Sequence, residues 1–285
     1  MIFVEGGTFK MGSQHDDRNA DNYNPDFSEL FFDEGPVHEV TVESFYMAKF
    51  EVTNELWCDV LGGDITFGEE QYARGSVSWS DASYFINNIN YSLSDVLPSG
   101  ATFALPTEEQ WEYAARGGVN HDSYAYAGSN TAAEVAVYGG ITEVPGQVGT
   151  LKPNSLGIYD LSGNALEWTS NYYTSDYSAD ASKSLTQHVM RGGGIHTRPN
   201  RLRDLRVSGR SVGRETLTQN YFGLRLVLNL PSTPTPTPTP TPDPSAIKQT
   251  EADAQSGRAK LTVVDGRLAI SLPDGRVVDI CGRRL

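Results

Sequence analysis

The segment HVMRGGGIHTRPNRLRDLRVSGR, residues 188–210, gathers the side chains of this sequence that are best suited to chemistry. Between Arg191 and Arg225 the chain carries eight arginines against two acidic residues, Asp204 and Glu215, although its formal net charge is −14. A guanidinium group is always charged, and its N–H donors match carboxylate, sulfate and phosphate groups. The composition favours a surface that binds an anionic group; the alternative interpretation is solvated surface charge.

A second segment, YDLSGNALEW, offers oxygen donors. Asp160 and Glu167 stand seven residues apart, and Gly163 interrupts the chain between them so that backbone carbonyls can turn inward. Carboxylate and carbonyl oxygens are the ligands that Ca²⁺ selects. Taken alone, the pattern favours a turn with solvated carboxylates, and a calcium site is the alternative.

Composition limits the class of protein. The 285 residues are 38% hydrophobic and 20% charged, which is ordinary for a soluble globular protein. The net negative charge argues against general binding of nucleic acid. Two cysteines, Cys58 and Cys281, cannot build a disulfide framework or a four-ligand zinc site. We expect no membrane span, because no stretch approaches the roughly 20 apolar residues required, and no signal peptide, because the residues after Met1 lack its basic and apolar regions.

These side chains must be positioned by a fold with little regular structure. We expect helices in NELWCDVLGG, capped by Thr53, in DASYFINNIN, capped by Ser80, and in EEQWEYAARGG, where Thr107 and Gln110 form a capping box. MIFVEGGTFKMG, HEVTVESFYMAKFEVT and YFGLRLVLNL read as strands. The remainder is rich in Gly, Asn and Ser and is predicted to form long loops. The fold class is therefore α+β.

The repeat PSTPTPTPTPTPDPS, residues 231–245, divides the chain. Alternating proline supports neither a helix nor a central strand and is typical of an extended spacer. We predict one domain over residues 1–230 and a small three-stranded β-meander over residues 246–285, with turns at Asp265–Gly266 and Pro273–Gly275. A meander of this size has little core of its own, and we expect it to anchor or multimerise the protein.

Seven motifs, read in order, resemble the formylglycine-generating (sulfatase-modifying factor) domain family. They are FVEGGTFKMGS, FYMAKFEVTNELW, LPTEEQWEYAARGG, YAGSN, LGIYDLSGNALEW, MRGGG and FGLRLVL, spread over residues 1–230. Several independent motifs in the right order are more specific than any single one. The resemblance implies the variant of the C-type lectin fold found in formylglycine-generating enzymes, with calcium as a structural ion.

The resemblance also implies a ligand set for that calcium. The family's site matches the side chains of Asp160 and Glu167 and the main-chain oxygens of Gly163 and Ala165. Structural Ca²⁺ is thus the cofactor that we expect.

Catalysis of the family type is not expected. The family's enzymes bind copper(I) with two cysteines and oxidise a substrate cysteine. Matching residues 191–193 to the family's RGG motif, and Arg206 and Arg210 to its later arginines, places Thr197 and Leu202 at the two cysteine positions. Copper(I) prefers thiolate, which neither side chain supplies. We therefore expect no copper and no enzyme activity of this kind.

The resemblance divides the arginines into two sets. Four match arginines common in the fold and are expected to be structural, paired with acidic residues: Arg191, Arg206, Arg210 and Arg225. Four fall where the family varies and are expected on the recognition face: Arg198, Arg201, Arg203 and Arg214.

Our leading hypothesis is a non-catalytic, receptor-like or adhesion-like binding protein, similar to the variable proteins of diversity-generating retroelements. Its recognition face is predicted over residues 195–204 and 211–220, for a protein or glycan ligand with anionic groups. The residues expected to contact the ligand are Ile195, His196, Thr197, Arg198, Asn200, Arg201, Leu202, Arg203, Asp204, Arg214, Thr216 and Asn220.

Two alternatives stay open because a fold alone does not choose a function. One is a formylglycine-generating type of enzyme or an accessory factor to one, which Thr197 and Leu202 weigh against. The other is a structural module of a surface or phage appendage. The sequence does not fix the compartment; display at a cell surface, outside the cell or on a phage particle fits the leading hypothesis.

Overall fold

The computed structural model describes residues 1–14, 18, 22–23, 33–140, 144–178 and 186–231, with the backbone of three strands beyond them. The predicted spacer therefore lies outside the described residues except for Pro231. The helical elements are α1 (Asn54–Leu61), α2 (Trp79–Ser92), α3 (Glu108–Ala115), α4 (Ala132–Val135) and the 3-10 turns η2 (Gly118–Asn120) and η4 (Leu202–Leu205).

The strands are short, as expected for a loop-rich α+β fold. They are β1 (Ile2–Val4), β2 (Gly7–Met11), β3 (His38–Val42), β4 (Phe45–Met47), β5 (Thr102–Ala104), β6 (Ala136–Val137), β7 (Ser162–Gly163), β8 (Leu166–Tyr172), β9 (Gln187–Arg191), β10 (Arg210–Arg214), β11 (Phe222–Gly223), β12 (Val227–Asn229), β13 (Lys260–Val264), β14 (Arg267–Ser271) and β15 (Val277–Val278).

Side-chain caps fix where the three main helices begin. The Thr53 hydroxyl accepts the Leu56 N–H before α1, and Thr107 and Gln110 form the predicted capping box before α3. Helix α2 begins earlier than predicted: its cap is Ser78, which forms a capping box with Asp81, and not Ser80. Asp81 stands three residues after Ser78, which is the spacing that a capping box requires.

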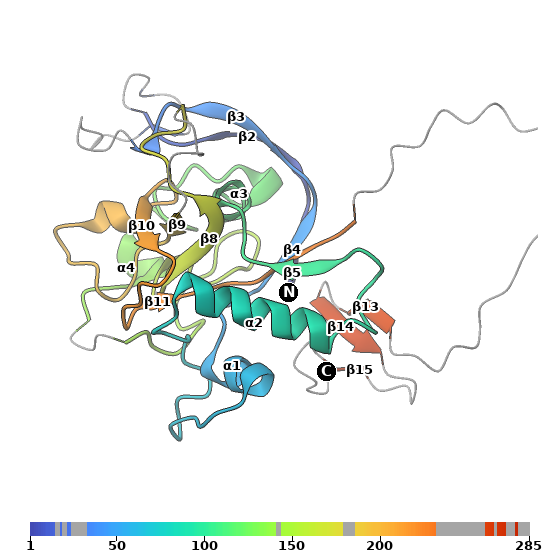
Figure 1. Cartoon of the computed structure of the whole chain (residues 1–285). Coiled ribbons are helices and arrows are strands. Elements are labelled where there is room, and N and C mark those ends of the chain that lie inside the picture. Colours follow the sequence, from blue (N-terminus) through green and yellow to red (C-terminus); the bar gives the residue numbers. More distant parts are fainter. Residues whose placement is uncertain are drawn as a thin grey trace, which may run out of the picture.

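One sheet is built around β12. Its order is β13-β14-β1-β4-β12-β5, and Leu228 of β12 pairs with Tyr46 of β4 on one side and Phe103 of β5 on the other. Val227 and Leu228, in the strand predicted from YFGLRLVLNL, are fully buried. In Figure 1, α2 runs along the lower side of the molecule, with α1 below it and the β2–β3 ribbon at the opposite end.

A second sheet, in the order β10-β9-β8-β11, positions the candidate site. Strand β9 pairs antiparallel with both β8 and β10, whereas β11 runs parallel to β8, with Phe222 opposite Leu166. Segments far apart in the sequence therefore share one sheet (Figure 1).

Two hydrophobic clusters hold the sheets and helices together. The first joins the buried face of α2, including Phe85 and Ile89, to Trp168 of β8 and Leu228 of β12. The second surrounds Trp111 of α3 and the β2–β3 ribbon. Both clusters bury large aromatic rings, each of which contributes a large apolar area to the core.

The three C-terminal strands lie where the meander was predicted. Strand β14 pairs antiparallel with β13 and β15, and it also meets the edge of the main sheet, with Arg267 opposite Ile2 of β1. The predicted turns at 265–266 and 273–275, and Cys281, lie outside the described residues.

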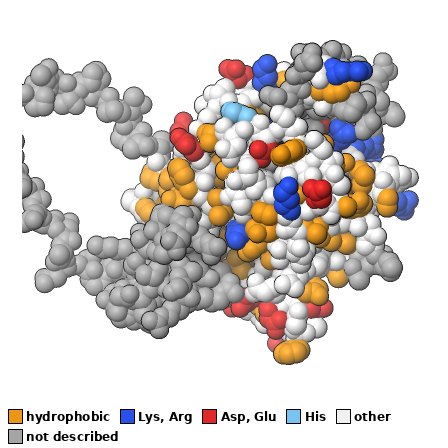
Figure 2. Space-filling model, turned by 180° about the vertical axis from the view of Figure 1, so that it is seen from behind, with side chains coloured by type: hydrophobic (Ala, Val, Ile, Leu, Met, Phe, Trp, Pro, Cys, Tyr) orange, Lys and Arg blue, Asp and Glu red, His pale blue; other side chains and the backbone are white. Residues whose placement is uncertain are grey.

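The described surface carries charges of both signs. On the face shown in Figure 2, acidic and basic side chains are interspersed among hydrophobic and uncharged ones. This face offers no continuous basic surface of the kind that a nucleic-acid backbone attracts. No helix among the described residues is long and apolar enough to cross a bilayer.

Candidate ligand-binding site

The site begins where the chain leaves β9. Gly192 and Gly193 both have positive φ values, +92° and +61°. A Cβ atom on Gly193 would lie 2.7 Å from the carbonyl oxygen of Asp204, so this close approach of two backbone segments requires glycine. The turn sends residues 194–209 away from the sheet as a loop, which returns to it as β10.

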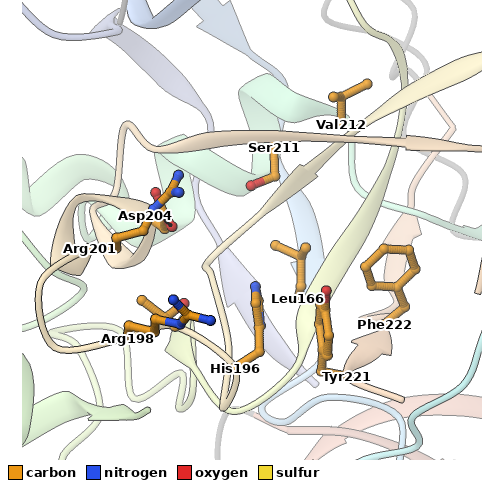
Figure 3. A pocket seen from close by; sticks show the side chains of 10 residues that line it. Leu166, His196, Arg198, Arg201, Asp204, Ser211, Val212, Tyr221 and Phe222 are labelled. Carbon is orange, nitrogen blue, oxygen red and sulfur yellow. Dashed lines mark ion pairs between the residues drawn. The ribbon is translucent and has the colours of Figure 1, made fainter. Parts of the chain in front are cut away.

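This loop and β10 enclose one side of a cavity of about 710 Å³ (Figure 3). The volume is in the range typical of ligand sites in proteins. The lining residues are Leu166, His196, Thr197, Arg198, Arg201, Asp204, Ser211, Val212, Tyr221 and Phe222. The two segments predicted to form a recognition face therefore border the same cavity.

A row of aromatic rings leads from the core to this cavity. Buried Trp168 meets Phe222 edge-on, with centroids 5.4 Å apart, and Phe222 meets Tyr221 in the same way at 5.2 Å. Tyr221 in turn stacks on His196, with centroids 3.7 Å apart and 13° between the planes. His196 is the outermost ring of the row. Burial lowers the pKa of His196 below its ordinary value of 6.5. The charge of Asp204 raises this pKa and that of Arg201 lowers it, both by less than burial does, so the ring is mostly neutral at pH 7.

Arginines stand opposite the aromatic row. Arg198 lines the cavity, and among the described residues its guanidinium makes no ion pair. Arg201 and Arg203 share the single carboxylate of Asp204, at 3.4 Å and 3.2 Å. Exposed pairs of this kind contribute little to stability. The side of the cavity shown at the left of Figure 3 therefore carries the guanidinium of Arg198 without an acidic partner among the described residues.

A smaller cavity of about 210 Å³ adjoins the first. It is lined by Asp33, Glu34, Arg201, Arg203, Asp204, Gly209, Arg210 and Ser211. Arg201, Asp204 and Ser211 line both cavities, which are therefore neighbours along the loop.

The arginines at the ends of the loop are buried and paired. Arg191 contacts Glu108 and Glu112 of α3 and donates to the carbonyls of Val207 and Gly209. Burial alone would raise the pKa of Glu112, but Arg116 and Arg191 outweigh it and hold this pKa below its usual value.

Two further arginines complete this structural set. Arg210 binds Glu108 through two hydrogen bonds, at 2.7 Å and 3.1 Å. Arg225 binds Glu167, with its closest contact at 2.7 Å. The predicted structural role is thus confirmed for Arg191, Arg210 and Arg225. Arg206 directly follows η4 and lines a third cavity together with Arg116 and Ser208.

The two positions that match the family's cysteines point to different places. Thr197 is 2% exposed, lines the large cavity, and its hydroxyl accepts the Gly194 N–H. Leu202 instead packs against the small cluster that includes Leu205 and Tyr138. None of the ten residues that line the cavity is a cysteine.

The predicted contact residues divide into three groups. Five line the large cavity: His196, Thr197, Arg198, Arg201 and Asp204. Five lie outside the large cavity: Arg203 lines the adjoining one, whereas Asn200, Arg214, Thr216 and Asn220 are exposed outside both cavities and are not placed to contact a ligand held there. Ile195 and Leu202 pack inward and are not placed to contact a ligand; Ile195 is 6% exposed. The sequence analysis missed Leu166, Tyr221 and Phe222, although Tyr221 directly follows the predicted segment.

The predicted calcium ligands fit a cation only in part. Both carboxylate oxygens of Glu167 are already bound, by Arg225 and by the indole N–H of Trp111. Asp160 accepts the Gly149 N–H with one oxygen, at 2.7 Å. Among the described residues, no three acidic, histidine or cysteine side chains converge as metal ligands.

The buried groups around Asp160 nevertheless carry more negative than positive charge. Glu51, which the sequence analysis did not single out, is buried beside Asp160 and Glu167. In the described structure, these three carboxylates face one guanidinium, that of Arg225. The carboxylate oxygens of Glu51 accept hydrogen bonds from the Ala165 N–H and the side-chain amide of Asn164. Burial, together with the charges of Asp160 and Glu167, raises the pKa of Glu51 well above its usual value. Either a proton or a cation relieves this surplus.

The comparisons with known proteins agree with this architecture. The model of the sulfatase-modifying factor enzyme 1-like domain matches residues 1–230. The chain therefore belongs to this family, which confirms the resemblance inferred from the seven motifs, and its fold is the C-type lectin variant of formylglycine-generating enzymes.

Individual relatives carry different names. The chaperone protein LppX of Paenibacillus barcinonensis is 30% identical over 241 residues, which cover 68% of this chain and 78% of that protein. The formylglycine-generating enzyme of Streptomyces coelicolor is 28% identical over 185 residues, 57% of this chain and 54% of the enzyme. The solved structure of Treponema denticola variable protein 1 matches with a TM-score of 0.63 at 22% identity and covers 80% of this chain and 94% of that one. At this identity the likeness concerns the fold.

Proposed function

We propose that the protein is a non-catalytic binding protein that holds its ligand in the cavity formed by residues 194–222. The observation that carries this proposal is that both predicted recognition segments border one cavity of about 710 Å³. The buried ion pairs of Arg191 and Arg210 support it, because they fix the two ends of the loop independently of the side chains between them.

The side chains at the family's cysteine positions support the non-catalytic part of the proposal. A threonine hydroxyl and a leucine cannot replace the thiolates that copper(I) prefers. Leu202 also packs away from the cavity that Thr197 lines. The test is incubation of the copper-loaded protein and oxygen with a peptide that bears CxPxR. Mass spectrometry should find the cysteine intact; its oxidation would establish the enzyme alternative.

We propose an anionic protein or glycan as the ligand. An array of proteins and glycans, probed with the full chain at fixed calcium concentration, should identify binders whose capture weakens as salt is raised. The variant with Arg198, Arg201 and Arg203 all replaced by alanine should lose this binding. Arg214→Ala is the matched control, because Arg214 is exposed but lies outside both cavities. Normal binding by the triple variant would refute the site.

We further propose that the loop is a segment whose sequence varies, as in the variable proteins of diversity-generating retroelements. The structural likeness to a variable protein supports this, and so does the separation of the loop from the buried strand β12. The test is the DNA beside the gene. We expect a template repeat of this segment that differs from it mainly at adenines. Absence of such a repeat would refute the proposal that the loop sequence varies.

We also propose a structural Ca²⁺ near Asp160, supported by the buried surplus of negative charge around Glu51, Asp160 and Glu167. An ion bound only to the folded state would raise stability by mass action.

A further inference from the structure

The aromatic row ends at a ring with one open face. Tyr221 covers one face of His196 at a centroid distance of 3.7 Å. In Figure 3 the opposite face of His196 looks across the cavity towards Arg198, with Arg201 and Asp204 beyond. Tyr221 and Phe222 line the same cavity, but each contacts two rings of the row, whereas His196 stands at its end and stacks on Tyr221 alone.

The two sides of this space favour a flat, π-electron-rich group. A neutral imidazole stacks on another aromatic ring, and a guanidinium is attracted to the face of such a ring. Burial lowers the pKa of His196, so at pH 7 the imidazole does not add a positive charge that would repel Arg198. A sugar ring has no π face, and it would gain hydrogen bonds but no cation–π attraction from the guanidinium.

The charge on the cavity wall adds a second requirement. Arg198 has no acidic partner among the described residues, and Arg201 shares Asp204 with Arg203. Guanidinium groups in this state pair with carboxylates, often through two parallel hydrogen bonds. The ligand group that fills the cavity is therefore expected to be accompanied by an acid.

We propose that the cavity binds an aromatic side chain of a protein partner, inserted between the His196 ring and the Arg198 guanidinium, with a neighbouring acidic residue of that partner paired to Arg198 and Arg201. The inference rests on the proposed binding function and names the class of its ligand. The cavity of about 710 Å³ leaves room for both side chains.

The test uses three short peptides and the full chain. The peptides are acetyl-Asp-Tyr-Asp-amide, acetyl-Asp-Leu-Asp-amide and acetyl-Lys-Tyr-Lys-amide, and the readout is the NMR signal of the His196 ring protons, assigned by its loss in His196→Asn. An aromatic ring stacked on the imidazole moves these signals upfield by its ring current. The first peptide should produce a saturable upfield shift, the second a weaker response without it, and the third no saturable response.

Variants separate a specific slot from general charge attraction. Arg198→Ala should weaken binding of the first peptide about tenfold, because one cation–π contact and one charged hydrogen-bond donor are lost. Arg214→Ala should bind as the parent does, and thermal melting checks that both variants are folded. Equal binding of the tyrosine and leucine peptides, unmoved His196 signals, or an unaffected Arg198→Ala would each overturn the inference.

The outcome is distinguishable from failure of the proposed function. If a ligand found on the array depends on Arg198 and Arg201 but the tyrosine peptide does not move His196, the cavity binds another class, such as an acidic glycan, and only this inference fails. If no ligand depends on these arginines, the binding function itself fails.

Discussion

Arg191 and Arg198 are seven residues apart and have opposite roles. Arg191 is fully buried, forms ion pairs with two glutamates of α3 and donates hydrogen bonds to two backbone carbonyls. Arg198 is exposed and faces a cavity with no ion partner among the described residues. A guanidinium that the fold has satisfied holds the scaffold together, whereas one that it has left open is available to a ligand.

The largest expected effect on stability comes from removing the buried guanidinium of Arg191. Arg191→Ala should lower the free energy of unfolding by about 3–5 kcal/mol, because it leaves buried carboxylates without their partner. Urea denaturation measures it. Arg214→Ala should stay within about 0.5 kcal/mol of the parent, as surface substitutions usually do. Similar values for the two variants would show that the buried pairs do not hold the scaffold.

A somewhat smaller effect is expected from calcium. At a free concentration a hundred times the Kd, a single bound ion adds about 2.7 kcal/mol to the stability. Asp160→Asn is the useful variant, because Glu167 also serves Arg225 and its loss would destabilise the protein with or without calcium. A chelator should lower the Tm of the parent and of the control Asp64→Asn, but not of Asp160→Asn. An equal change in Tm for all three proteins would refute the proposed calcium site.

Acid should weaken the buried cluster specifically. Folding holds the pKa of Glu112 below its ordinary 4.5 through Arg116 and Arg191, against the effect of burial. The unfolded chain thus binds a proton at a pH where the folded protein does not, so this part of the stability is complete above about pH 4.5 and is lost as the pH falls through the lowered value. Unfolding curves from pH 7 to 3 should show it, with a shallower acid limb for Glu112→Gln.

Glu34 gives the opposite sign and serves as the internal control. Burial raises its pKa in spite of hydrogen bonds from Ser13 and Ser208. The folded protein keeps this proton where the unfolded chain has released it, so the contribution of Glu34 to stability falls as the pH rises from about 4.5 to the raised value. Matching pH profiles for Glu34→Gln and Glu112→Gln would contradict both assignments.

The smallest change in stability is expected from the arginines that line the cavities. Replacing Arg198, Arg201 and Arg203 together by alanine removes partly exposed pairs with Asp204, and pairs of this kind contribute roughly 0–1 kcal/mol. For a domain of this size the Tm should fall by no more than about 4 °C. Thermal melting beside the binding assay tests it. A cooperative transition lost altogether would place these arginines in the scaffold.

Local signals in the sequence were sufficient for much of the fold. Thr53 is an N-cap, Thr107 forms a capping box with Gln110, and α1 and α3 begin directly after them. The misplaced start of α2 was avoidable, because Ser78 has an acidic residue three positions later and Ser80 does not. Alternation and apolar content likewise identified β1 to β4 and β12.

The cavity depended on pairings that no local pattern reveals. Leu166 and Phe222 meet because β8 and β11 run parallel, and the sequence motif around Phe222 indicates only a buried strand. Glu51 escaped notice for the same reason, since its hydrogen bond to Asn164 spans 113 positions. Ile195 was assigned to the recognition face from its place in the loop, yet its N–H donates to the Asn164 carbonyl and its side chain turns inward.

The central sheet also bears on how the protein is made. Strand β4 is flanked by β1 on one side and by β12 on the other, so a strand near the start of the chain waits for a neighbour that ends at Asn229. On the ribosome, the first two hundred residues leave the tunnel with one edge of β4 unpaired and open to wrong partners. The central sheet can therefore close only after the chain has been synthesised beyond Asn229.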